Sequence, residues 1–151
     1  DDEAAILAAI DALPRKAAEG TRLDLALRQG QLVLGEGPRL QPNTPVLVLM
    51  TDGLPNQVPF GVGSPDPDCP DQECVVRRVA AAVKGAGTQL FTIGLGEGED
   101  VLRGLLEAVA RAPGDYFFAP DAEDLAAIYR MVAGRIQECP RATVTPRGGL
   151  R

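Results

Sequence analysis

The sequence contains no histidine and no tryptophan, and aromatic residues make up only 4% of its 151 residues. Without histidine, no imidazole can act as general base beside a nucleophile, which argues against hydrolytic catalysis. The three cysteines Cys69, Cys74 and Cys139 form no CxxC pair, so a structural zinc site or a thioredoxin-like redox site has little support. Because aromatics are few, the core must be built from alanine, valine, leucine and isoleucine.

The chain also lacks a surplus of positive charge, since its formal net charge is −6 and its pI is about 4.6. This argues against nonspecific binding to nucleic acid or anionic membranes and is compatible with a cation site. No run of 18 apolar residues is present, so we expect no transmembrane helix. Asp1-Asp2-Glu3 cannot form the basic start of a signal peptide, so we expect the natural start upstream of residue 1.

Hydrophobic spacing predicts helices that alternate with short apolar strands. Helices are predicted over residues 2–12, 22–34, 71–85, 99–111 and 121–137, and strands over 45–50, 89–94 and 116–119. This order predicts an α/β fold, a Rossmann-like parallel sheet with helices on both faces. Residues 54–70 contain five prolines and are expected to form an irregular loop. Ligands of such sheets bind where the strands end.

The stretch VLVLMTDGLPN places Asp52 at the end of the first predicted strand. This strand is the most apolar of the three, as expected for the centre of a sheet. However, it comes first, and the two later strands can flank it on one side only. A bare apolar edge favours aggregation, so the pattern predicts a sheet of which only a part is present.

Two short motifs resemble the von Willebrand factor type A family, whose metal-ion-dependent adhesion site is built from three loops. Gly20-Thr21, in EGTRLDLAL, is similar to the second loop, and Thr51-Asp52-Gly53 is similar to the third. The later stretches AAAVKGAGTQLFTIGLG and YFFAPDAEDLAAIYRMVAGRI resemble the following units of that fold. The resemblance covers about residues 4–138.

The first loop of the family, Asp-x-Ser-x-Ser, cannot be present because Ser64 is the only serine. The family's strand order is 3-2-1-4-5-6, and the three predicted strands correspond to the last three. The resemblance therefore implies a partial domain over residues 1–139. Residues 140–151, rich in proline, glycine and arginine, are predicted to form a disordered tail.

The resemblance implies a function in metal-dependent protein binding or adhesion, outside the cell or on its surface. Thr21 and Asp52 would hold Mg²⁺, or Mn²⁺ or Ca²⁺, and an acidic residue of a protein partner would complete the coordination. Because two side chains are few for Mg²⁺, we expect the chain alone to bind it weakly or not at all. We expect a missing N-terminal part of the domain, or another chain, to complete the sheet. The residues expected to shape partner choice are Gly53, Leu54, Pro55, Asn56 and Gln57.

Taken alone, the cysteines leave two interpretations open: a local Cys69–Cys74 pair, or three free thiols in a cytosolic protein. In the fold of the resembled family, Cys69 and Cys74 lie near the adhesion site. Cys139 follows a helix that runs away from that site. The resemblance thus implies a Cys69–Cys74 disulfide, with Cys139 unpaired in this chain and bonded to an N-terminal cysteine in the whole domain.

Several alternatives remain at this point. Thr21 could be only a helix cap, and Asp52 could only cap the turn at Gly53. Gly94–Gly98 resembles a nucleotide loop, although the acidic residues around it favour a tight turn instead. The acidic residues Asp66, Asp68, Asp71 and Glu73 lack the spacing of a Ca²⁺ loop. The whole chain could also be an intracellular subunit that acts with an ATPase, as in chelatase-type assemblies, or a nucleotide-binding enzyme domain.

Overall fold

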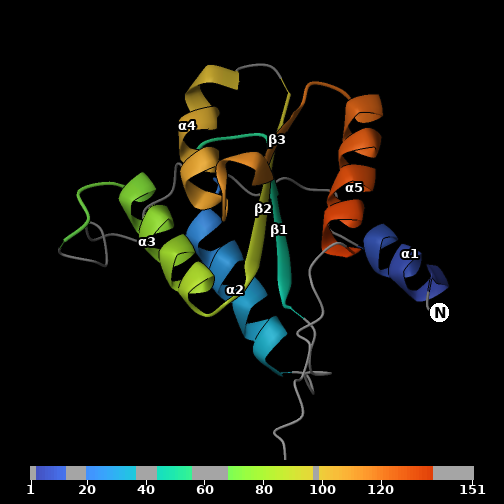
Figure 1. Ribbon diagram of the computed structural model, residues 1–151, viewed down its shortest axis with the longest axis horizontal. Coiled ribbons are helices and arrows are strands. Elements are labelled where there is room, and N and C mark those ends of the chain that lie inside the picture. The colour runs from blue at the N-terminus through green and yellow to red at the C-terminus, as the bar shows by residue number, and fades with distance from the viewer. Residues whose placement is uncertain (1–2, 13–19, 37–43, 56–67, 97–98, 138–151) are drawn as a thin grey trace, which may run out of the picture.

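The computed structural model describes residues 3–12, 20–36, 44–55, 68–96 and 99–137. Helices and strands alternate along most of this length (Figure 1). The elements are α1 (Glu3–Asp11), α2 (Leu23–Glu36), β1 (Val46–Thr51), α3 (Gln72–Gly85), β2 (Gln89–Leu95), α4 (Glu99–Val109), the 3-10 turn η1 (Pro113–Asp115), β3 (Tyr116–Ala119) and α5 (Ala122–Gln137). The predicted α/β fold and its element order are confirmed, with bounds that differ by one or two residues.

The sheet has three parallel strands in the order β1-β2-β3. β1 pairs with β2 along its whole length, from Val46 opposite Gln89 to Thr51 opposite Gly94. Within the described residues, no strand pairs with the other edge of β1. The most apolar strand is therefore an edge strand here, as the sequence pattern predicts.

Helices cover the two faces of the sheet unequally (Figure 1). Helices α2, α3 and α4 lie on one face, where Leu49 and Leu90 of the sheet join their side chains in the larger core cluster. Helix α5 lies on the other face and packs Ile128 and Val132 against Phe91 of β2. The prediction of helices on both faces is confirmed.

Polar side chains fix the helix ends. Asp71 caps α3 by accepting a hydrogen bond from the backbone N–H of Cys74 at 2.8 Å. Asp121 accepts hydrogen bonds from the backbone N–H groups of Glu123 and Asp124 at the start of α5. Asp121 therefore caps α5, which explains why the helix starts where it does.

Two basic residues join α3 and α4 at the amino edge of the sheet. Lys84, near the end of α3, donates from Nζ to the carbonyl oxygens of Ala108 and Ala110. Arg111 donates in return to the carbonyl oxygens of Lys84 and Thr88. Each side chain thus satisfies terminal carbonyls that belong to the other helix or to its following turn. Burial, followed by the nearby positive charge of Arg111, lowers the pKa of Lys84 from its ordinary value.

Cys69 and Cys74 form a disulfide, with their Cα atoms 5.3 Å apart. The predicted pairing is confirmed. It ties the end of the proline-rich segment to the first turn of α3, beside the Asp71 cap. Cys139 and the predicted tail lie outside the described residues, and the predicted domain limits stay a prediction.

The disulfide predicts which cysteines react with an alkylating reagent in solution. Alkylation without a reductant should modify Cys139 and leave Cys69 and Cys74 untouched, as read by mass spectrometry of the peptides. Replacing both bridged cysteines by alanine should lower the free energy of unfolding by about 2 kcal/mol, because the short closed loop gains freedom in the unfolded chain. Cys139→Ala is the matched control and should leave stability unchanged. Alkylation at all three positions would contradict the pairing.

Gly30 of α2 faces Leu47 of β1 at a close contact between the helix and the sheet. A Cβ built on Gly30 would stand 2.5 Å from Cδ1 of Leu47, far inside van der Waals contact. By contrast, a Cβ on Gly104, in the middle of α4, would have nothing within 4 Å. The absence of a side chain at Gly30 therefore lets α2 approach the sheet.

These two glycines form a matched pair for measurement. Gly104→Ala should raise the free energy of unfolding by up to about 1 kcal/mol through helix propensity. Gly30→Ala gains the same helix propensity but overpacks the contact between α2 and β1. Overpacking lowers the free energy of unfolding by about 1–3 kcal/mol, so urea titrations should show a net destabilisation. Leu47→Ala should lower the free energy of unfolding less in the Gly30→Ala variant than in the parent chain, because it also removes the overpacked side chain. Equal stabilisation by both alanines would contradict the close approach.

Candidate metal centre

The end of β1 is held in a tight turn by Thr51. Its Oγ1 donates a hydrogen bond to the carbonyl oxygen of Gly53 at 2.9 Å and accepts one from the Gly53 N–H at 3.2 Å. Thr51 is buried, whereas Asp52 between the two partners is exposed. Asp52 was an alternative candidate to cap this turn, but Thr51 closes it instead. The Asp52 carboxylate therefore remains exposed at the carboxyl edge of the sheet.

Thr21 lies beside this turn although 30 residues separate it from Thr51 in the sequence. Its Oγ1 is 3.8 Å from the position that a Cβ on Gly53 would occupy. The preceding Gly20 has a φ of 101°, a left-handed conformation that favours glycine and turns the chain into α2. The structure thereby brings together the two loops that contain Thr21 and Asp52.

A partly buried ion pair follows Thr21 directly and joins Arg22, just before α2, to Asp24 in its first turn. Arg22 donates from Nε and Nη2 to the two carboxylate oxygens of Asp24, each at 2.8 Å. The Asp24 side chain is 3% exposed and that of Arg22 is 20% exposed. A two-point contact of this kind fixes orientation as well as distance, so it defines how the chain enters α2 behind Thr21.

The pKa of Asp24 is lowered from its ordinary value. The main cause is the hydrogen bonding from Arg22; burial opposes it, and the positive charges of Arg22 and Arg28 add to the lowering. Asp24 is therefore ionised at neutral pH although it is buried. Sequence reasoning missed both Asp24 and Thr51; the Arg-x-Asp spacing and the Thr before Asp52 are the signals that point to them.

The chemistry of the candidate ligands can be tested against a divalent cation. The hydroxyl of Thr21 and the carboxylate of Asp52 are hard oxygen donors of the kind that Mg²⁺ takes. Among the described residues, no group of three or more acidic or cysteine side chains gathers to hold a metal. The donors fit such an ion in type, but they supply only part of its coordination.

The residues expected to contact a partner differ in their surroundings. Gly53 is half-buried, Leu54 packs against the larger core cluster, and Pro55 is buried. Asn56 and Gln57 lie outside the described residues. Of the described part of this loop, Asp52 is the exposed residue, and the role of its neighbours in partner choice stays a prediction.

Two glycines at the end of β2 have structural roles. Gly94 is buried, and a Cβ there would lie 3.3 Å from Cδ1 of Leu106 on α4. Gly96 has a φ of 84° and turns the chain out of the strand. This agrees with the expected tight turn and gives these two glycines a role in packing and turning that needs no nucleotide.

Comparison with known proteins identifies the same fold. A sequence model described as the von Willebrand factor type A domain matches residues 1–130. A search of curated proteins finds no match. No helix in the described part of the chain is long and apolar enough to cross a membrane.

The solved structures that match are larger proteins. The open conformation of the pilus adhesin SpaC from Lactobacillus rhamnosus GG matches with a TM-score of 0.69 and 20% identity, over 89% of this chain and 21% of that one. Proximal thread matrix protein 1 from the mussel byssus matches with a TM-score of 0.64 and 22% identity, over 88% and 29%. A second structure of that protein has a zinc-occupied MIDAS (metal-ion-dependent adhesion site) motif. It matches with a TM-score of 0.61 and 20% identity, over 91% of this chain and 30% of that one. The chain thus spans less than a third of these matched structures.

The buried ion pair predicts a pH dependence. Because folding lowers the pKa of Asp24, its stabilisation is complete above the ordinary aspartate value of about 3.9 and is lost as the pH falls through the lower, folded value. At pH 7, Asp24→Asn should lower the free energy of unfolding by about 2 kcal/mol. The difference from the parent should shrink as the carboxyl is protonated in acid.

The control is the exposed pair of Arg103 and Glu107, which has the same 2.8 Å separation. Glu107→Gln should cost less than about 0.5 kcal/mol, because exposed ion pairs are weak. Denaturant titrations of both variants across the acid range measure the two effects. A cost for Asp24→Asn that does not vary with pH would contradict the assignment.

Proposed function

The chain belongs to the von Willebrand factor type A family, and on that premise we propose that it is part of a metal-dependent protein-binding module. The observation that carries the proposal is the position of the Thr21 hydroxyl beside the Thr51-Asp52-Gly53 turn. Two loops far apart in the sequence supply oxygen donors at one edge of a parallel sheet, which is where ligands of such sheets bind.

Each residue of this edge has a task that its surroundings support. The Asp52 carboxylate and the Thr21 hydroxyl would hold the cation, for which Mg²⁺, Mn²⁺ and Ca²⁺ are all candidates. Thr51 holds the turn that presents Asp52, and the Arg22–Asp24 pair fixes the entry to α2 behind Thr21. When bound, the ion would offer a coordination position to an acidic residue of a protein partner. This is binding chemistry and requires no nucleophile or base.

Two further observations support the setting. One matched structure is described as a pilus adhesin and another as a matrix protein with a zinc-occupied MIDAS motif. These descriptions support adhesion and a divalent cation, and we propose the same for this chain. The Cys69–Cys74 disulfide supports an oxidising location, outside the cell or on its surface.

The open edge of β1 supports a sheet that another segment completes. Val48 and Met50 point to the α5 side of the sheet and are 36% and 43% exposed. Met50 contacts Tyr129 of α5, which is itself exposed. We propose that the N-terminal part of the domain, or another chain, pairs with this edge, covers these side chains and supplies the missing first loop of the metal site.

Paramagnetic broadening by Mn²⁺ tests the site even when binding is weak. In amide NMR spectra of the chain, added Mn²⁺ should broaden the signals of Thr21, Thr51, Asp52 and Gly53 first. Asp52→Asn and Thr21→Val should each reduce this broadening, because each removes one oxygen donor.

Glu123→Gln is a matched control, since it removes an exposed carboxylate from the start of α5 and should leave the broadening at Thr21 unchanged. Calorimetry with Mg²⁺ should detect weak binding or none, as two side chains fill few coordination positions. The proposal fails if the broadening centres on Asp68 and Asp71, or if it persists at Thr21 in Asp52→Asn.

A further inference from the structure

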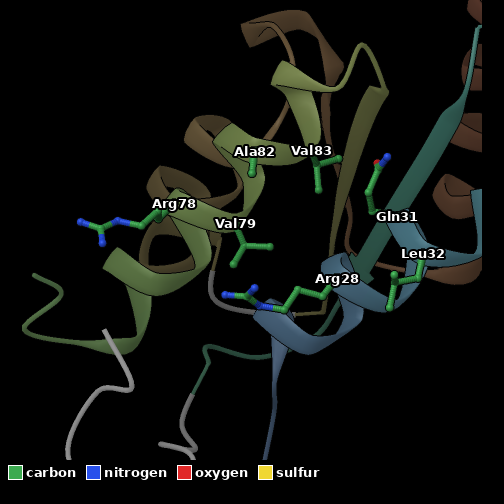
Figure 2. A pocket seen from close by; sticks show the side chains of 7 residues that line it. All are labelled: Arg28, Gln31, Leu32, Arg78, Val79, Ala82 and Val83. Atoms are coloured by element: carbon green, nitrogen blue, oxygen red, sulfur yellow. The ribbon is translucent and has the colours of Figure 1, made fainter. Parts of the chain in front are cut away.

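A groove of about 540 Å³ lies between α2 and α3, and neither candidate metal ligand is among its lining residues (Figure 2). Arg28 and Leu32 of α2 form one wall, and Val79, Ala82, Val83 and Arg78 of α3 form the other. Gln31 of α2 also lines the groove, so its lining is mainly aliphatic with one amide and two guanidinium groups, in a chain with a net charge of −6.

The charge and the apolar surface have an order along the groove. Arg28 precedes Leu32 by one helical turn, and Arg78 precedes Ala82 by one turn. Both helices run from the carboxyl edge of the sheet towards its amino edge, as parallel crossovers require (Figure 1). The two arginines consequently stand at the end of the groove nearer Thr21 and Asp52, and the aliphatic part extends away from it.

Helix α2 has exposed apolar side chains that the fold does not cover. Leu32, which lines the groove, is 58% exposed, and Leu25, which is not part of the lining, is 50% exposed. Leu25, Arg28 and Leu32 are spaced three and four residues apart, so they form one stripe along α2. This stripe combines apolar contacts with a positive charge between them.

Both arginines already act on carboxylates. Arg78 lies 3.6 Å from Asp68 in an ion pair whose two side chains are 50% and 77% exposed. Such exposed pairs are weak and exchange partners at little cost. Arg28 contributes to the lowered pKa of Asp24, whose two oxygens are already occupied by Arg22. A further carboxylate would therefore find two guanidinium groups at the head of an apolar groove.

We propose that this groove is a second docking site, for an acidic amphipathic segment of a partner protein. Its carboxylates would contact Arg28 and Arg78, and its apolar side chains would lie on Leu32 and Ala82, over the buried Val79 and Val83. The groove lies between two helices, which suits a helical segment laid into it. The site needs no metal, so it goes beyond the proposed function and can be tested apart from it.

The distance between the two sites adds a constraint on one partner that uses both. Thr21 lies just before α2 and Arg28 is seven positions further on, which corresponds to about 10 Å at the helical rise per residue. A helical partner segment covers the same length with about seven residues. A helical partner with an acidic residue for the metal and a second one about seven residues away would reach both.

The test uses a fluorescein-labelled synthetic helix with glutamate and leucine on one face, titrated with the full chain in the presence of a chelator. The Arg28→Glu/Arg78→Glu variant should weaken binding at least tenfold, and Leu32→Ser should weaken it severalfold. Arg130→Glu makes the same kind of charge change on α5, on the other face of the sheet, and should change the affinity less than twofold. Circular dichroism confirms that each variant folds.

Amide NMR locates the peptide, and the largest shift changes should occur at Val79, Ala82 and Val83. A peptide with glutamine in place of glutamate should bind at least tenfold more weakly. The proposal is overturned if the parent chain does not bind the acidic peptide, or if the glutamine peptide binds equally well. Cosedimentation with anionic lipid vesicles that disappears in the Arg28→Glu/Arg78→Glu variant would also overturn it, in favour of docking on a membrane surface.

Discussion

The constraint on which the molecule depends is the parallel register of β1 and β2. Because Thr51 stands opposite Gly94, both strands end at the same edge and release their loops side by side. The chain must then return to the amino edge through a helix before each new strand. This return brings the start of every crossover helix to the edge where Asp52 is presented. The candidate metal centre is therefore a consequence of topology, and few residues at the edge need special geometry.

Helices cover the two faces of this sheet to different extents. On the α2, α3 and α4 side, Leu49 and Leu90 are buried in a continuous core. On the α5 side, one helix covers Phe91 and Ile93, but it leaves Val48 and Met50 exposed. An apolar edge strand with bare side chains is a site for pairing with another segment or for aggregation. Under the proposed function, the missing donors of the metal site and the incomplete cover of β1 have one common remedy, a segment next to β1.

Much of the fold could be predicted from sequence because the signals are local. Asp71 and Asp121 mark helix starts, and the valines of α3 recur at helical spacing, so the elements agree with the pattern. The proximity of Thr21 to Gly53 came from a family resemblance, since spacing in the sequence says nothing about it. The Arg22–Asp24 pair was missed because a buried aspartate and a solvated one look alike in sequence. The groove was missed for a related reason: its lining comes from two helices that lie side by side only in the folded chain.

Helix α2 connects the two proposed sites, and the physical nature of that connection follows from its packing. Its start carries Thr21 and the Arg22–Asp24 pair, its middle packs Gly30 closely on Leu47, and its outer stripe lines the groove. A helix held at both its start and its middle acts as a rigid spacer. A partner that binds both sites would therefore gain through the effective concentration of its second contact. Coupling by a conformational change requires a two-state element, whereas a fixed spacing selects partners whose two acidic groups match it.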